Sequence, residues 1–144
     1  MKTLTRYMLD TNTVSYILRG QSPKARKRLE RLSEEEEACI SAITEGEIRC
    51  GLAKHAVKPE TRDNIERFLE AIDILPWDSD VARVYGSTRA KLEAAGRPIH
   101  NLDLLIASHA MTVEAVLVTN DRVFRNLVNN LRTISWAADL PARV

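Results

Sequence analysis

Short apolar runs alternate along this chain with longer segments in which apolar residues recur at helical spacing. The short runs predict strands and the longer segments predict helices. The predicted strands are residues 6–9, 38–41, 73–77, 115–120 and 132–136, and the predicted helices are 14–19, 23–37, 43–53, 59–72, 79–96 and 102–111. Strands that alternate with helices are typical of an α/β fold, with a mainly parallel β-sheet flanked by helices on both faces. Since neither a repeat nor a linker interrupts the pattern, we expect a single domain over residues 1–144.

Local signals set the expected helix ends. Thr11 or Asn12 is predicted to cap the first helix, and Pro23 to open the second. The second helix is expected to run into the glutamates 34–37, which we interpret as a solvated helix end without a role.

Charge and cysteine usage narrow the class of protein. The 21 Lys and Arg residues nearly balance the 20 Asp and Glu residues, for a formal net charge of +1, so an anionic partner has to be met by a local cluster of cations. No apolar stretch approaches the roughly 20 residues that span a bilayer, and the first ten residues do not have the pattern of a secretory signal, so we expect a soluble, cytoplasmic protein. Cys39 and Cys50 lack a CxxC partner and are expected to be reduced, partly buried thiols.

Four acidic residues are predicted near the carboxyl ends of the strands, where parallel sheets bind their ligands. Asp10 ends the first strand and Asp121 follows the strand 115–120, while Glu47 and Asp103 lie on helices that begin near the same edge. Each of them alone has an ordinary explanation as a helix cap, a surface residue or a turn former. No Lys or Arg is evidently matched to them, and the apolar run after Asp103 draws its first helical turn inward, where a carboxylate needs a partner.

Carboxylates held close together raise one another's pKa, and burial raises it further. A divalent cation removes this conflict. Oxygen ligands without His or Cys suit a hard ion such as Mg²⁺ or Mn²⁺, and such sites carry out phosphoryl chemistry by activating a water and stabilising the departing oxygen.

Four ordered motifs then resemble one known family. The motifs are "MLDTN" at 8–12, "ISAITEGEIRCG" at 40–51, "GRPIHNLDLLIASHA" at 96–110 and "LVTND" at 117–121. Together they are similar to the motifs of the PIN-domain ribonucleases, and within that family to the VapC-type toxins of toxin–antitoxin pairs.

This resemblance implies a PIN-like fold and an acidic metal site made of Asp10, Glu47, Asp103 and Asp121, in which the second motif selects Glu47 over Glu45. Asp121 either binds the ion directly or supports a ligand, and Asn12 and Thr119 are implied as supporting polar groups. The implied activity is Mg²⁺- or Mn²⁺-dependent endonucleolytic cleavage of structured RNA, such as tRNA or rRNA loops. The implied partners are a cognate VapB-type antitoxin that blocks the site and a second copy of the chain in a homodimer.

An acidic site needs cations nearby if it is to hold RNA. The candidates for a phosphate-binding rim are Lys24, Arg26, Lys27, Arg28, Arg97 and Arg122, although those on 23–37 also fit an ordinary solvated helix face. His100 and His109 are interpreted as turn and packed-helix residues, and Trp77 and Trp136 as strand-end packing residues in preference to base-stacking ones.

Three other classes of function compete with the nuclease. A haloacid-dehalogenase-like phosphatase also begins with an Asp at a strand end, but Asn12 stands where its second acid belongs. A Ser-His-acid hydrolase lacks its G-x-S-x-G elbow, and Ser108 and His109 are neighbours that point apart on a helix. A non-enzymatic binding module would leave the four acids as caps or partner contacts.

Overall fold

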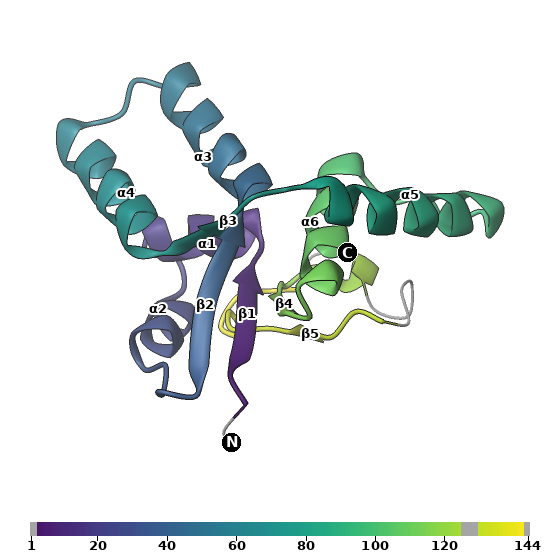
Figure 1. Cartoon of the computed structure of the whole chain (residues 1–144). Coiled ribbons are helices and arrows are strands. Elements are labelled where there is room, and N and C mark those ends of the chain that lie inside the picture. Colours follow the sequence, from purple (N-terminus) through teal and green to yellow (C-terminus); the bar gives the residue numbers. More distant parts are fainter. Residues whose placement is uncertain (1–2, 125–129, 143–144) are drawn as a thin grey trace.

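The computed structural model describes residues 3–124 and 130–142, in which one parallel sheet is surrounded by helices (Figure 1). Its strand order is β3-β2-β1-β4-β5, and every neighbouring pair is parallel. The strands are β1 (Thr5–Leu9), β2 (Glu36–Ser41), β3 (Asp73–Leu75), β4 (Val116–Val118) and β5 (Thr133–Ile134). The helices are α1 (Thr11–Leu18), α2 (Pro23–Glu30), α3 (Ala42–Lys54), α4 (Pro59–Ala71), α5 (Ser79–Ala94) and α6 (Asn101–Thr112), with a short 3-10 turn η1 (Arg122–Phe124). The predicted fold class is confirmed.

The two faces of the sheet bury different helices. On the central strand β1, the side chains of Met8 and Leu9 point to opposite faces, and both are fully buried. Leu9 packs in a core with residues of α1, α2 and α4, whereas Met8 packs in a second core with residues of α6. Strands that are buried on both faces read as continuous apolar runs, which is why the run 115–118 looks so strongly strand-like.

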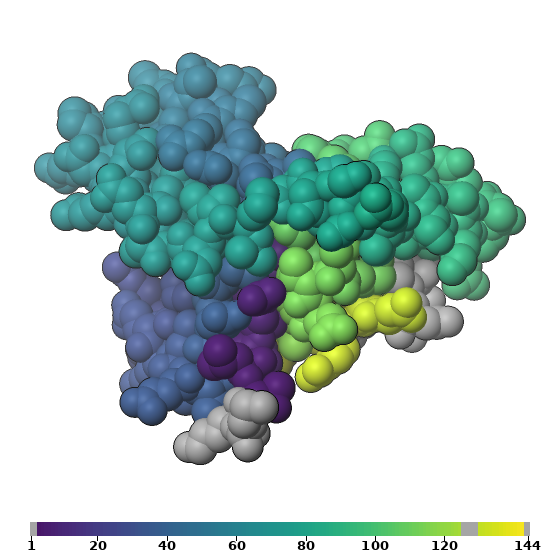
Figure 2. Space-filling model, in the orientation of Figure 1, coloured from purple at the N-terminus to yellow at the C-terminus, as the bar shows by residue number. Residues whose placement is uncertain are grey.

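Two parts of the fold project from this body. Figures 1 and 2 show α3 and α4 extending from one side and α5 extending from the other. α5 is capped by Asp78, whose side chain accepts hydrogen bonds from the backbone N–H groups of Asp80 and Val81. Of the helices in the described residues, none is both long enough and apolar enough to cross a bilayer. Both cysteines are free thiols, but Cys50 is exposed, so only Cys39 fits the predicted burial.

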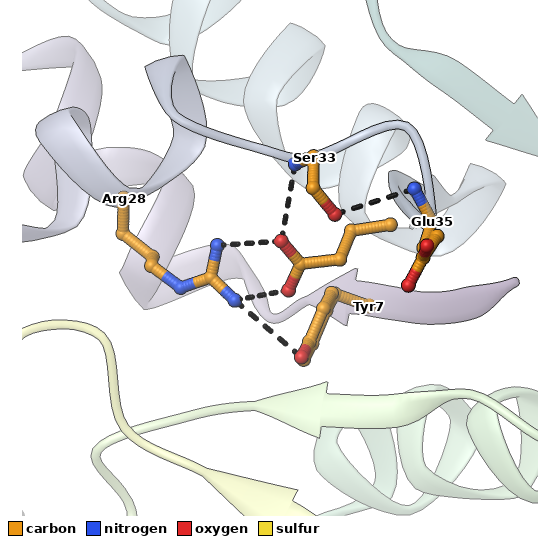
Figure 3. A network of polar contacts seen from close by, with 5 residues as sticks. Tyr7, Arg28, Ser33 and Glu35 are labelled. Atoms are coloured by element: carbon orange, nitrogen blue, oxygen red, sulfur yellow. Dashed lines mark hydrogen bonds and ion pairs between the residues drawn. The ribbon is translucent and has the colours of Figure 1, made fainter.

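The predicted end of the second helix is wrong. α2 ends at Glu30, and Glu36 lies in β2 instead of on a solvated helix end. The Arg28 guanidinium faces the carboxylate of Glu36 and the hydroxyl of Tyr7, while the Ser33 N–H donates to the same carboxylate. Arg28, Ser33 and Tyr7 of this network are seen in Figure 3. The hydrogen bond from Arg28 is the main cause that lowers the pKa of Glu36 to about 2. Glu36 pairs with Thr5 of β1, so sheet pairing takes the place of the helix that the charge pattern favoured, and the ion pair with Arg28 accompanies it.

The predicted cap of the first helix is also wrong. α1 begins one turn earlier than expected, and its cap is Asp10, whose Oδ1 accepts a hydrogen bond of 2.8 Å from the Thr13 N–H. Asp is as good a cap as Ser or Asn because its carboxylate satisfies an N–H that has no partner within the helix. Asp10 thus ends a strand and starts a helix.

Candidate acidic metal centre

The four predicted acids lie together. A cleft of about 380 Å³ is lined by Asp10, Glu47, Asp103 and Asp121, together with Thr11, Asn12, His100 and Leu102. The acids come from the ends of β1 and β4 and from α3 and α6, so residues up to 111 positions apart in sequence share one cavity. Pairing of β1 with β4 is the step that brings Asp10 and Asp121 to the same edge.

Asp10 is held rigidly at the base of the cleft. Its backbone N–H donates to the Val118 carbonyl at 3.0 Å, which extends the ladder between β1 and β4 by one residue. The residue is only 7% exposed, and burial raises the pKa of the carboxyl. Hydrogen bonds from Thr119 and Thr13 lower the pKa, whereas the charge of Asp121 raises it again. The ionised form of Asp10 is therefore costly unless a cation is present.

Asp103 experiences the whole acidic cluster. It lies in the first turn of α6, where a carboxylate is favoured by the helix dipole, and its side chain is partly buried. Burial raises the pKa of Asp103 most, and the charges of Asp121, Asp10 and Glu47 raise it too, against an opposing effect of His100. Asp103 therefore lies within electrostatic range of the other three carboxylates.

Hydroxyl groups and backbone amides orient the remaining two acids. Thr11 Oγ1 donates to Glu47 Oε1 at 2.7 Å and lies 3.2 Å from Thr44 Oγ1. Asp121 Oδ1 accepts from the Val123 N–H at 3.0 Å, and the Asp121 N–H donates to Thr119 Oγ1 at 3.0 Å. Thr119 thus contacts the acidic site, as a supporting group should. Thr11, expected only as a possible helix cap, instead positions Glu47; its place directly after Asp10 is the only signal in the sequence.

The donor set fits a hard divalent cation in type and in charge. All four acids offer carboxylate oxygens, and neither Lys nor Arg lines the cleft within the described part of the chain. Across residues 3–124 and 130–142, however, no three side chains among His, Cys, Asp and Glu already converge to hold a metal ion. Glu47 is turned toward Thr11 and Asp121 toward the Val123 N–H. Each of these hydrogen bonds uses one oxygen and leaves the other carboxylate oxygen of Glu47 and Asp121 available to an ion.

The predicted cationic rim is only partly brought to this edge. Arg28 lies over the rings of Tyr7 and Trp136, with its charge centre 5.3 and 5.1 Å from their centroids, and pairs with Glu36 at the opposite end of β2. Arg26 pairs with Glu30 on its own helix at 3.3 Å. None of the four α2 cations, which also include Lys24 and Lys27, lines the acidic cleft.

Two other predicted cations, Arg122 and Arg97, lie close in sequence to residues that line the acidic cleft. Arg122 follows Asp121 and lines a second cleft that shares Asp121 with the acidic one. Arg97 lines a groove beside α5 and α6 and lies three residues before His100. These two remain candidates for contacts with phosphate.

The structure places the two predicted histidines in different surroundings and packs both tryptophans. His109 is buried, its Nδ1 lies 2.8 Å from Ser41 Oγ, and burial lowers its pKa, so it is a packed-helix residue as predicted. His100, expected in a turn, stands at the start of α6 and lines the acidic cleft. Trp77 Nε1 donates to the Leu105 carbonyl at 3.0 Å, and Trp136 is buried against Tyr7, so both pack as expected.

Comparisons with known proteins agree with this geometry. The PIN domain family matches residues 7–129. The chain is 34% identical to Ribonuclease VapC2 of Rickettsia felis over 90% of this chain and 97% of the relative. It is 31% identical to the tRNA(fMet)-specific endonuclease VapC of Shigella flexneri over 93% of this chain and 100% of the relative.

Solved structures give the same result. VapBC2 of Rickettsia felis bound to a DNA fragment from its promoter superposes with a TM-score of 0.84 at 32% identity, over 92% of this chain and 99% of that one. DNA-bound VapBC of Salmonella typhimurium gives a TM-score of 0.83 at 30% identity, with the same two coverages. On these matches over nearly its whole length, the chain belongs to the PIN-domain family, in the group of the VapC proteins.

Proposed function

We propose that this protein is a Mg²⁺- or Mn²⁺-dependent endoribonuclease that acts as the toxin of a VapBC-type toxin–antitoxin pair in the cytoplasm. The observation that carries the proposal is the meeting of four carboxylates, from four separate elements, in one cleft at the carboxyl edge of the sheet. The names of the relatives, which include a ribonuclease and a tRNA(fMet)-specific endonuclease, support the same reaction class.

In this proposal Asp10, Glu47, Asp103 and Asp121 hold the ion, and Asp121 acts either as a ligand or through one. The ion, when bound, supplies a lowered pKa for an attacking water and stabilisation of charge on the departing oxygen of the phosphodiester. The protein supplies placement. The ladder and helix cap fix Asp10, Thr11 orients Glu47, and Thr119 supports the turn that carries Asp121.

The cleft is open enough for a nucleotide strand to reach the acids. Asp103 and Asp121 are partly exposed, and Asn12 and the exposed His100 offer polar groups at its border. Single-stranded loops of structured RNA suit such a site because their bases and phosphates are not locked in a helix. Relatives from Shigella flexneri and Salmonella typhimurium are named for tRNA(fMet), which makes a tRNA or rRNA loop the substrate we propose.

The proposed partners are a cognate VapB-type antitoxin and a second copy of this chain. Solved relatives from Rickettsia felis, Salmonella typhimurium and Haemophilus influenzae are VapBC complexes. An antitoxin that covers the acidic cleft would inhibit cleavage by excluding both the ion and the RNA.

The test uses purified, antitoxin-free protein and total cellular RNA, with Mg²⁺ or Mn²⁺ or with a chelator, followed by mapping of new RNA ends. Specific ends are expected with metal, and none with chelator or with Asp10→Asn. Asp63→Asn is the matched control, because Asp63 is exposed on α4 and outside the cleft. Ends that persist in the chelator or in Asp10→Asn would refute the metal site, and wild-type protein that produces none would refute the nuclease.

A further inference from the structure

A second groove lies outside the acidic site and shares none of its lining residues. It has a volume of about 620 Å³, lies beside α5 and α6, and is lined on its polar side by Arg83, Ser87, Thr88, Lys91 and Arg97. No acidic side chain of the described residues lines it. We refer to it as the α5–α6 groove. It is opposite in charge to the acidic cleft, although the chain as a whole is nearly neutral.

The donors of the groove follow one face of a helix. Arg83, Ser87 and Lys91 are spaced by four residues on α5, so their side chains lie above one another. Four residues advance an α-helix by about 6 Å, and Arg83 and Lys91 are therefore about 12 Å apart along the axis. A regular row of hydrogen-bond donors and cations suits a ligand whose negative groups repeat.

The cations of this row are available to a ligand. Lys91 and Arg97 are exposed, and neither takes part in an ion pair among residues 3–124 and 130–142. Arg83 pairs with Asp80 at 2.6 Å, but both side chains are 74% exposed. An ion pair that is open to water contributes little free energy, so a phosphate can replace the Asp80 carboxylate at low cost.

The groove also lies next to the acidic cleft along the chain. Arg97 lines the groove and His100 lines the cleft, and three residues of extended chain span at most about 11 Å between their Cα atoms. A single RNA strand of a few nucleotides is long enough to contact both.

We propose that the α5–α6 groove binds the phosphate backbone of the RNA strand that continues from the scissile phosphodiester in the acidic cleft. The proposal rests on the proposed ribonuclease function and names a second contact region for its substrate. An acidic peptide is the competing ligand for a cationic groove. RNA is favoured because the donors repeat along the helix and because Arg97 of the groove is only three residues from His100 of the cleft in which RNA would be cut. The groove is also lined by the apolar side chains of Val84 and Leu92, against which a ribose or base face can pack.

The experiment measures RNA binding without turnover. Fluorescently labelled tRNA is titrated with Asp10→Asn protein in chelator, at several salt concentrations. The test variant adds Arg83→Ala, Lys91→Ala and Arg97→Ala. The control variant instead adds Arg31→Ala, Lys54→Ala and Lys58→Ala, which remove the same charge from exposed positions outside the groove and the cleft.

Each phosphate contact with a single strand contributes about 0.7 to the slope of log K against log salt, so loss of three contacts lowers the slope by about 2. We expect this change in the test variant and a slope close to the parent's in the control. The charge-reversed pair Lys91→Glu and Arg97→Glu should weaken binding further, and circular dichroism checks that each variant folds.

Equal slopes in the test and control variants would overturn the proposal. Because this assay involves no cleavage, its outcome is independent of the end-mapping test. A wild-type protein that cuts no RNA refutes the nuclease, whereas an unchanged salt slope refutes only the groove.

Discussion

Replacing Asp10 by Asn removes one buried charge from the acidic cleft and keeps both the size of the side chain and its helix cap. The amide oxygen of Asn can still accept the 2.8 Å hydrogen bond from the Thr13 N–H, and Asn and Asp are equivalent caps. Asp10→Ala would lose that cap as well, at a cost of about 1 kcal/mol. The Asn variant therefore isolates the effect of the charge.

Asp10→Asn is expected to change the stability of the fold in opposite directions without metal and with metal. Burial and the charge of Asp121 raise the pKa of Asp10 above its ordinary value of 3.8, so the folded state holds the proton more tightly than the unfolded state does. The free energy of unfolding of the metal-free protein thus falls as the pH rises above 3.8. At pH 7, Asp10→Asn should be at least as stable as the wild type without metal, and its stability should depend less on pH.

In the presence of metal, the wild type is expected to be more stable than Asp10→Asn. An ion that binds only the folded wild type at 100 times its Kd adds about 2.7 kcal/mol of stability. For a chain of this size that corresponds to a rise in Tm of roughly 5 to 11 °C. Asp10→Asn should lose most of this rise, because it removes a charged ligand from the base of the site.

Differential scanning calorimetry of the wild type, Asp10→Asn and the control Asp63→Asn, in chelator and in Mn²⁺, measures both effects. A metal-free Asp10→Asn that is less stable than the wild type at pH 7 would contradict the assignment of a costly buried charge. A metal-dependent rise in Tm as large as that of the wild type would contradict the assignment of Asp10 as a ligand.

Two predictions concern residues outside the cleft. His109→Ala should lower the free energy of unfolding by about 2 to 4 kcal/mol, because it leaves a cavity and removes the hydrogen bond to Ser41, while cleavage by the folded protein stays within a few-fold of wild type. Chemical denaturation and turnover, with exposed His55→Ala as the control, test this; a loss of turnover without a loss of stability would contradict it. Arg28→Met should destabilise the fold at pH 6. The difference in the free energy of unfolding between variant and wild type should shrink as the pH falls from 4.5 to about 2. The reason is that the pKa of Glu36 is lowered in the folded state, so its stabilising ionisation is lost over that range. Urea unfolding at pH 3 and pH 6 measures the change, and a pH-independent difference would exclude the pair as its cause.

Much of the fold follows from patterns that act over short distances. The apolar runs before Asp10 and Asp121 place both residues at strand ends, and the parallel arrangement puts those ends at one edge. Most helix ends follow from Pro, Gly and Asp signals, as at Pro59 and Asp78. The position of the acidic site was predictable for this reason, since strand direction alone collects the acids on one side of the sheet.

A distant partner overrides a local preference in the errors at the end of α2, at Arg28 and at Thr11. Glu36 has the surroundings of a helical residue in sequence, but it pairs with Thr5 of β1 and lies in a strand, where Arg28 of α2 forms an ion pair with it. The same pairing removes Arg28 from the predicted RNA-binding rim. Thr11 looks like a cap until the packing of α1 beside α3 places its hydroxyl 2.7 Å from Glu47.

The sequence by itself therefore determined the class of fold, the edge of the sheet that carries the chemistry and the residue types available there, because these depend on local periodicity and on the direction of the strands. Only the tertiary structure decided which hydroxyl orients Glu47, which cations remain free to bind an anion, and that a cationic groove lies beside α5 and α6. Those features depend on contacts between side chains of different helices and strands. No local pattern in the sequence specifies such contacts.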